Sequence, residues 1–189
     1  MQKKSDTSER TKANLLESFW KLYNENTFSK IKIKMITDLA GYNRCTFYQY
    51  FTDIDNLLEY AEDKLINELI AYLDIAINNL ESKDNIIKAA ETYEHFGYYL
   101  SILLGPNGDP AFSTKYKNAL KPLLFNKFNL DNNDPRIDII CDFSLGAIIS
   151  SLVNWYDKKM PISPESLASL LNTLLTEGLI SLIKKESLH

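Results

Sequence analysis

The 189-residue chain is 45% hydrophobic and 24% charged, a globular soluble balance with room for one domain of ordinary size plus a small one. Its six glycines and six prolines fall in a few places, which argues against many short strands and favours long helices. The net charge of -4 divides unevenly, because residues 1–51 carry nine basic and five acidic side chains and the remainder carries 12 basic and 20 acidic. A basic N-terminal part on an acidic body suits local phosphate contact without general binding to polyanions.

The first predicted helix runs from about residue 8 to residue 25. Its apolar side chains follow helical spacing, at Leu15, Leu16, Phe19, Trp20, Leu22 and Tyr23. Asn26 and Thr27 end this helix, and we expect Phe28 to tuck back under it. A second helix is predicted from about residue 33 to residue 40, and its inward-facing residues are expected to be Ile33, Ile36, Leu39 and Ala40.

Residues 37–58 hold the most informative pattern of the chain. Leu39 and Ala40 close the second helix, Gly41 supplies a tight turn, and Asn43 stands where an N-cap is wanted. A third helix is then predicted over residues 44–50, with Phe47 and Phe51 packing inward. A short helix that ends in Ala-Gly and re-enters through an Asn cap is the sequence form of a helix-turn-helix, whose second helix lies in the DNA major groove.

Asp53 is the predicted N-cap of a long fourth helix that extends to about residue 80. This helix leaves the DNA-binding part and enters the body, so the domain boundary lies inside a helix rather than in a linker. We place the two domains at residues 1–58 and 59–189.

The body repeats the helical theme. Asp84 is expected to cap a helix over residues 85–104, and the Gly- and Pro-rich stretch 105–110 is the clearest loop. A helix over residues 111–128 follows, kinked or split at Pro122. Two strongly apolar helices are predicted over residues 135–156 and 164–185. The fold class is therefore all-α.

Cellular location is predicted from the cysteines and from two absences. Cys45 and Cys141 have no metal-binding spacing, and the N-terminus lacks the apolar core of an export signal. No apolar run approaches the roughly 20 residues that span a membrane. We expect a cytoplasmic protein in a reducing compartment, without a membrane partner.

Several of these residues together resemble the DNA-binding domain of the TetR family of bacterial repressors. They are Phe28-Ser29-Lys30-Ile31, Ile36, Ala40-Gly41, Asn43-Arg44-Cys45-Thr46-Phe47-Tyr48, Tyr50-Phe51 and Leu57-Leu58. The resemblance covers roughly residues 10–60 and is nearest to the branch, found largely in low-G+C Gram-positive bacteria, that writes this segment N-R-S-T-F-Y. Residues 103–109 and 155–170 are similar to C-terminal regions of the same branch.

The resemblance implies an all-helical homodimer with an N-terminal three-helix helix-turn-helix domain and a C-terminal helical domain for ligand binding and dimerisation. The last two helices would form a four-helix bundle between two subunits. Their apolar side chains support a dimer independently, or form the core of one chain: Leu145, Ile148, Ile149, Leu152, Val153, Leu167, Leu170, Leu171, Leu174, Leu175 and Leu179.

The candidate DNA-contacting residues lie in and just before the two short helices: Lys32, Lys34, Asn43, Arg44, Cys45, Thr46, Tyr48, Gln49 and Tyr50. Arg44 has the planar fork that suits guanine or a bidentate phosphate contact. Thr46 and Gln49 are placed for base edges, while the resemblance implies phosphate contacts for Tyr48 and Tyr50. Asn43 is alternatively only a cap, and Tyr50 only half-buried packing. Lys32 and Lys34 either contact phosphates or are solvated.

Three positions depart from the family pattern. Lys32 replaces a Thr that usually caps the second helix, which exchanges a cap for a charge. Ile54 replaces a Lys, so a phosphate contact is not expected there. Cys45 replaces a small Ser or Gly, and close approach to DNA explains it more simply than redox sensing.

The candidate effector site consists of aromatic residues of the body, namely Tyr93, Phe96, Tyr99, Phe112, Tyr116 and Phe143. The same residues are alternatively ordinary core. No cofactor or metal site is expected, since His95 beside Glu91 and Glu94 is the one internal histidine. No catalytic triad, glycine-rich phosphate loop or metal cluster appears, so we expect no enzyme.

Two functions follow. The first is a TetR-like repressor, dimeric on a palindromic operator of double-stranded DNA and released by a small-molecule effector. The second is a DNA-binding regulator whose effector is a partner protein, because relatives in this branch control dihydroxyacetone metabolism.

Overall fold

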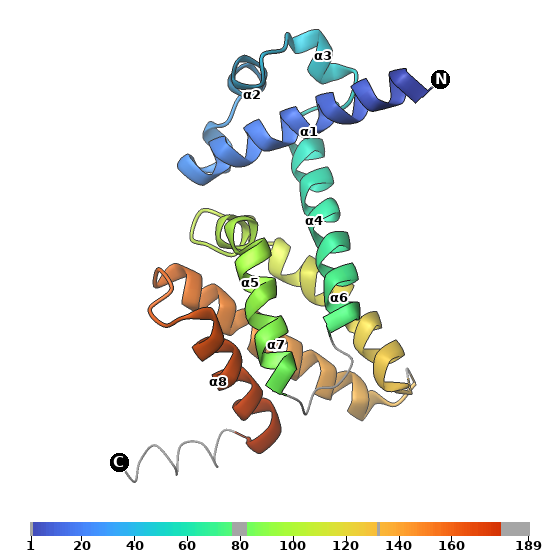
Figure 1. Cartoon of the computed structure of the whole chain (residues 1–189), viewed down its shortest axis with the longest axis vertical. Coiled ribbons are helices and arrows are strands. Elements are labelled where there is room, and N and C mark those ends of the chain that lie inside the picture. Colours follow the sequence, from blue (N-terminus) through green and yellow to red (C-terminus); the bar gives the residue numbers. More distant parts are fainter. Residues whose placement is uncertain (1, 77–82, 132, 179–189) are drawn as a thin grey trace. The chain divides into compact units, whose positions relative to one another are not determined.

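The computed structural model describes residues 2–76, 83–131 and 133–178, and within these ranges the regular structure is helical throughout (Figure 1). The helices are α1 (Gln2–Glu25), the 3-10 helix η1 (Phe28–Lys30), α2 (Ile33–Ala40), α3 (Arg44–Tyr48), α4 (Ile54–Ala76), α5 (Lys83–Leu103), α6 (Phe112–Phe128), α7 (Pro135–Asp157) and α8 (Pro164–Glu177). The prediction of an all-α fold is confirmed.

Two compact units divide the chain. The N-terminal unit is Met1–Leu65 and the C-terminal unit is Ile66–His189, so the division lies within α4 and later along it than the predicted boundary after residue 58. Each unit buries its own set of large side chains, as a domain with its own core does.

The N-terminal unit is built on α1. Leu15 and Phe19 of this helix are fully buried, together with Ile36 of α2, Phe47 of α3 and Leu57 of α4. One large apolar side chain thus reaches the core from each short helix, so burial as well as the turn fixes the helix-turn-helix.

An aromatic cluster closes the far end of α1. Phe28 in η1 lies edge-on to Phe19, with ring centroids 6.5 Å apart, and within 5.7 Å of the Tyr23 ring. The expectation that Phe28 tucks back under the first helix is confirmed.

Several predicted helix ends differ from the observed ones. The first helix begins at Gln2 rather than near residue 8, because the polar stretch before residue 8 carries no helix breaker. α3 ends at Tyr48 rather than residue 50. α5 begins at Lys83, so Asp84 lies inside its first turn and is not its N-cap. Pro122 lies within α6 without ending it. The predicted continuations past residues 76 and 178 lie largely outside the described residues.

In the C-terminal unit, α5 packs against α8 and α6 packs against α7. α7 starts at an N-cap, where the Asp134 side chain accepts a hydrogen bond from the backbone N–H of Arg136, and α8 starts likewise at Ser163. The turn between these two helices is held by the Trp155 indole N–H, which donates to the Ile162 carbonyl at 2.9 Å.

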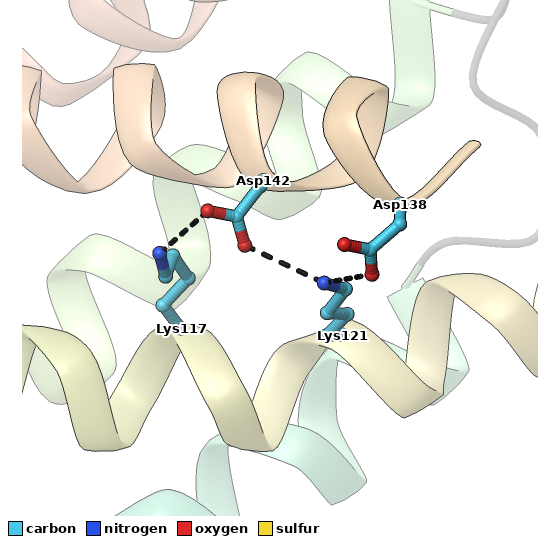
Figure 2. A network of polar contacts seen from close by, with 4 residues as sticks. All are labelled: Lys117, Lys121, Asp138 and Asp142. Atoms are coloured by element: carbon cyan, nitrogen blue, oxygen red, sulfur yellow. Dashed lines mark hydrogen bonds and ion pairs between the residues drawn. The ribbon is translucent and has the colours of Figure 1, made fainter. Parts of the chain in front are cut away.

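Four charged side chains join α6 to α7 (Figure 2). Lys117 Nζ lies 2.9 Å from a carboxylate oxygen of Asp142, and Lys121 pairs with both Asp138 and Asp142. The hydrogen bond and charge of Lys117 lower the pKa of Asp142, and Lys121 adds to this effect. The pKa of Lys121 is raised, chiefly by its hydrogen bond to Asp138.

One helix differs from the sequence-based expectation about membranes. Judged only by its length and composition, α7 could cross a bilayer. Only 22% of its most apolar stretch is buried inside the chain. The expectation that no apolar run approaches this length was therefore wrong for α7. Its exposed large side chains are Ile139, Ile140 and Phe143, the last being 76% exposed.

Candidate nucleic-acid interface

The turn between α2 and α3 is set by one glycine and one cap. Gly41 has φ 75° and ψ 29°, a left-handed conformation that a side chain disfavours. The N–H of Tyr42 then donates to the Thr37 carbonyl at 2.9 Å, which closes the end of α2. The turn therefore directs the chain from α2 into α3, as the Ala-Gly pattern predicts.

The Asn43 side chain caps α3, which confirms its predicted structural role. Its Oδ1 atom accepts from the Thr46 backbone N–H at 2.9 Å and from the Thr46 hydroxyl at 3.1 Å. With both bonds on Oδ1, the side-chain amide hydrogens of Asn43 stay available to a ligand.

A second pair of capping hydrogen bonds lies at the start of α4. Asp53 accepts from the Asn56 backbone N–H at 2.7 Å, and Asn56 in turn accepts from the Thr52 N–H at 3.3 Å. The predicted N-cap at Asp53 is confirmed, and the reciprocal pair holds the chain that leaves α3.

The side chains of α3 divide into an inner and an outer set. Phe47 and Phe51 are 0% and 4% exposed, and their rings pack together with centroids 5.6 Å apart. Tyr48, by contrast, is 57% exposed. The aromatic rings of Phe47 and Phe51 therefore hold α3 in the core, while Tyr48 faces solvent.

All nine candidate DNA-contacting residues lie at the surface. Lys32, Lys34, Asn43, Arg44, Cys45, Tyr48 and Gln49 are exposed, while Thr46 and Tyr50 are half-buried. Lys32 occupies the N-cap position of α2, and its side chain makes no capping hydrogen bond. The helix therefore lacks the side-chain cap that a Thr would supply there, as expected from the sequence. Cys45 is a free thiol on this surface.

Sequence reasoning missed two residues of this unit. Tyr42 lies in the turn, and its hydroxyl accepts a hydrogen bond from the Asn14 side-chain amide of α1 at 3.0 Å. Leu39, which was predicted to face inward, is instead 53% exposed, because it lies in the last turn of α2 beside Gly41. The sequence offered only the presence of a tyrosine in the turn. Its hydrogen-bond partner could not be predicted, because Asn14 lies 28 positions earlier in the chain.

The candidate effector residues do not form one uniform set. Phe112 and Tyr116 are buried and stacked on each other, and Phe96 is buried against the Tyr72 and His95 rings. Tyr99 is half-buried beside Tyr98.

Two candidates stand apart from that buried group. Phe143 lies on the exposed face of α7, which does not suit the lining of an interior cavity in one chain. The Tyr93 side chain lies outside the described residues.

Tyr72, whose ring lies against the buried Phe96, also takes part in a polar contact. Partial burial raises the pKa of Tyr72, and the neighbouring Glu91 carboxylate adds to the rise. The Tyr72 hydroxyl lies 3.4 Å from a Glu91 oxygen. Within the described ranges, no group of three or more His, Cys, Asp or Glu side chains is placed to hold a metal ion.

Solved structures share this fold. A TetR transcriptional regulator from Streptococcus agalactiae is similar with a TM-score of 0.66 and 22% identity, covering 91% of this chain and 97% of its own. A tetR-family regulator from Streptomyces coelicolor has a TM-score of 0.67 at 17% identity, covering 95% and 85%. The dihydroxyacetone kinase operon activator DhaS has a TM-score of 0.64 at 19% identity, covering 88% and 94%.

Comparison of the sequence with protein families identifies the family of this chain. No curated protein matches the chain significantly. A TetR C-terminal family model, described as "Transcriptional regulator C-terminal region", matches residues 81–177, which is just over half of the chain. The N-terminal unit carries a capped helix-turn-helix and the C-terminal unit matches this model, so the chain belongs to the TetR family of transcriptional regulators.

Proposed function

We propose that the protein is a cytoplasmic repressor that binds a palindromic operator as a homodimer and is released by a small molecule in its C-terminal unit. The observation that carries the proposal is the capped α3, which presents Arg44 and Tyr48 to solvent while Phe47 anchors the helix in the core. A rigid helix with exposed polar tips is what reading a major groove requires.

The side chains divide by the contact their chemistry allows. Arg44 has the donor geometry for guanine O6 and N7, and Gln49 for adenine or another base edge. The Thr46 hydroxyl donates to Asn43, which leaves its methyl group and oxygen lone pairs to the DNA. Lys32 and Lys34 contribute charge to phosphates, which positions the helix without reading sequence.

Phosphate contacts are proposed for the remaining residues of the set. Tyr48 and Tyr50 offer hydroxyl donors, and Asn43 offers its free amide hydrogens. Cys45 is a small side chain that permits close approach.

A second copy of the chain is proposed to cover the exposed apolar face of α7 and α8. Ile139, Ile140 and Phe143 of α7 are exposed, as are Leu170 and Leu175 of α8. A soluble chain rarely leaves so many large apolar side chains in water.

The sequence left open whether the apolar residues of the last two helices form a dimer interface or the core of one chain. Leu145, Ile149, Leu152, Leu167 and Leu171 are buried within one chain and belong to its core. Replacing Phe143 by Asp should convert a dimer to a monomer in sedimentation, whereas the exposed Lys158→Asp serves as a matched surface control. A dimer that persists in the Phe143 variant would exclude this face.

The effector proposal rests on the buried aromatics of the C-terminal unit. Phe96, Phe112 and Tyr116 supply apolar surface, and Tyr72 and Glu91 supply nearby polar atoms. A ligand that binds the folded unit raises its stability by mass action, so a thermal-shift screen of metabolites tests this step. A regulator controlled by a partner protein is the second candidate, and it predicts no hit in that screen.

The decisive experiment is to incubate the protein with fragmented genomic DNA at near-physiological salt and to sequence what is retained. Enrichment of a short palindrome is expected. Arg44→Ala should abolish this enrichment, whereas Lys158→Ala, which removes an equal charge from the C-terminal unit, should not. Retention without a shared motif would overturn the operator proposal.

A further inference from the structure

Tyr42, in the turn of the helix-turn-helix, makes a side-chain hydrogen bond to α1. The Asn14 Nδ2 atom donates to the Tyr42 hydroxyl oxygen at 3.0 Å, and both side chains are half-buried. This is a bond between residues far apart in sequence, so it holds the phenol at one place relative to the scaffold helix. The ring cannot swing freely into solvent while the bond is made.

The direction of this hydrogen bond decides what the phenol can still do. A tyrosine hydroxyl has one donor hydrogen and two acceptor lone pairs. Asn14 uses a lone pair, so the hydrogen remains, and among the described residues it meets no protein acceptor. A hydroxyl that accepts one hydrogen bond is polarised, which strengthens the bond that it donates.

The position of Tyr42 in the turn suits a hydrogen bond from its hydroxyl group to the DNA backbone. Tyr42 follows Gly41 in the turn and directly precedes Asn43 and Arg44, both of which are exposed. Any duplex read by Arg44 therefore brings its backbone close to the turn. Most protein–DNA hydrogen bonds go to phosphate oxygens and sugars, and tyrosine hydroxyls are among their donors.

We propose that Tyr42 is a further DNA-contacting residue, which donates its hydroxyl hydrogen to a backbone phosphate, and that Asn14 is the positioning residue that holds it there. The inference rests on the proposed DNA-binding function and adds to it a contact from outside the recognition helix. Because the phenol is neutral, the contact adds affinity without releasing an additional counterion.

The first test replaces Tyr42 by Phe, which keeps the ring and removes only the hydroxyl. We expect about tenfold weaker binding to the duplex recovered from the genomic selection, with an unchanged slope of log affinity against log salt. Lys34→Ala should instead reduce that slope by about one. Tyr60→Phe is the matched control, because Tyr60 is half-buried in the same unit and packs on Phe51.

The second test locates the phosphate. Duplexes that carry one neutral methylphosphonate at a time should show a position in each half-site where the wild-type protein loses affinity and Tyr42→Phe does not. Asn14→Leu should weaken binding when Tyr42 is present and have no further effect beside Tyr42→Phe. Thermal unfolding is followed in parallel, since a purely structural role would change stability alike in both backgrounds.

Each outcome separates the claims. Wild-type affinity in Tyr42→Phe overturns the phosphate contact and leaves the DNA-binding proposal intact. An equal loss from Asn14→Leu in both backgrounds overturns its positioning role. If the wild-type protein binds neither a selected nor a random-sequence duplex at low salt, the proposed function fails and this inference fails with it.

Discussion

The two units of this chain use aromatic and apolar residues in opposite ways. In the N-terminal unit, Phe47 and Phe51 are buried anchors and the exposed tips beside them are polar or amphipathic, as at Arg44 and Tyr48. In the C-terminal unit, an equally large ring, Phe143, is left in water. The N-terminal unit thus buries the large phenylalanine rings of its helix-turn-helix, and the C-terminal unit leaves one of its own exposed.

This difference between the two units shows which of the proposed binding surfaces can be identified from a single copy of the chain. The proposed DNA-binding surface of the N-terminal unit is largely polar, and local caps such as Asn43 fix its geometry. The exposed apolar surface of α7, of whose most apolar stretch 22% is buried, is the basis of the proposal that a second copy of the chain covers it. The variants below test the two halves of this comparison.

The largest effect is expected from removing the N-terminal anchor. Phe47→Ala should cost about 3–5 kcal/mol of unfolding free energy, because the ring is 0% exposed and leaves a cavity. Tyr48→Ala, one residue along and 57% exposed, should change stability by less than about 0.5 kcal/mol while weakening DNA binding. Chemical denaturation and DNA titration of both variants measure this contrast. Equal stability losses would refute the division into inner and outer faces.

A glycine in the C-terminal unit gives the next effect. A Cβ atom at Gly108 would lie 2.1 Å from the Leu103 carbonyl oxygen, so Gly108→Ala should displace the loop after α5 and destabilise this unit by about 1–3 kcal/mol. At Gly97, within α5, the nearest atom is the Tyr156 hydroxyl oxygen at 3.7 Å. Gly97→Ala should therefore be neutral or stabilise by up to about 1 kcal/mol. Thermal melts of the pair decide, and a harmless Gly108→Ala would contradict the loop geometry.

The prediction from sequence succeeded where the governing physics is local. The turn at Gly41, the cap at Asn43 and the inward Phe47 each depend on a few neighbouring residues, and the structure confirms all three. The recognition that the chain is a TetR-family regulator followed from these same residues and agrees with the family match.

Prediction failed where the answer depends on contacts between distant residues. Whether Leu145 or Phe143 faces solvent follows from how α7 packs on α6, and helical periodicity gives both the same apolar signal. The bond from Asn14 to Tyr42 is likewise set by tertiary packing. The operator contacts of Lys32 to Tyr50 and the effector site stay predictions.

A smaller effect tests the cap of the recognition helix. Asn43→Ala removes the acceptor of the Thr46 N–H and should cost about 1 kcal/mol of stability in the N-terminal unit. Asn43→Asp keeps the acceptor but loses the amide donors and adds a negative charge beside the DNA. It should retain the stability and still weaken DNA binding. Full binding by the Asp variant would show that Asn43 is only a cap.

The smallest effect concerns the ion pairs between α6 and α7. Lys117 lowers the pKa of Asp142, so this carboxylate stabilises the folded unit above its unfolded pKa, near 3.8, and the contribution is lost as pH falls through the lower folded value. Asp142→Asn should remove that acid-side dependence, and high salt should weaken it in the wild-type protein, because both partners are partly exposed. The Asp142 variant leaves Lys121 paired with Asp138, so the two helices stay joined while one titrating group is removed. Denaturation at a series of acidic pH values compares the two proteins. If their stabilities fall in parallel through this range, the ion pairs of Asp142 contribute nothing measurable to the stability of the folded unit.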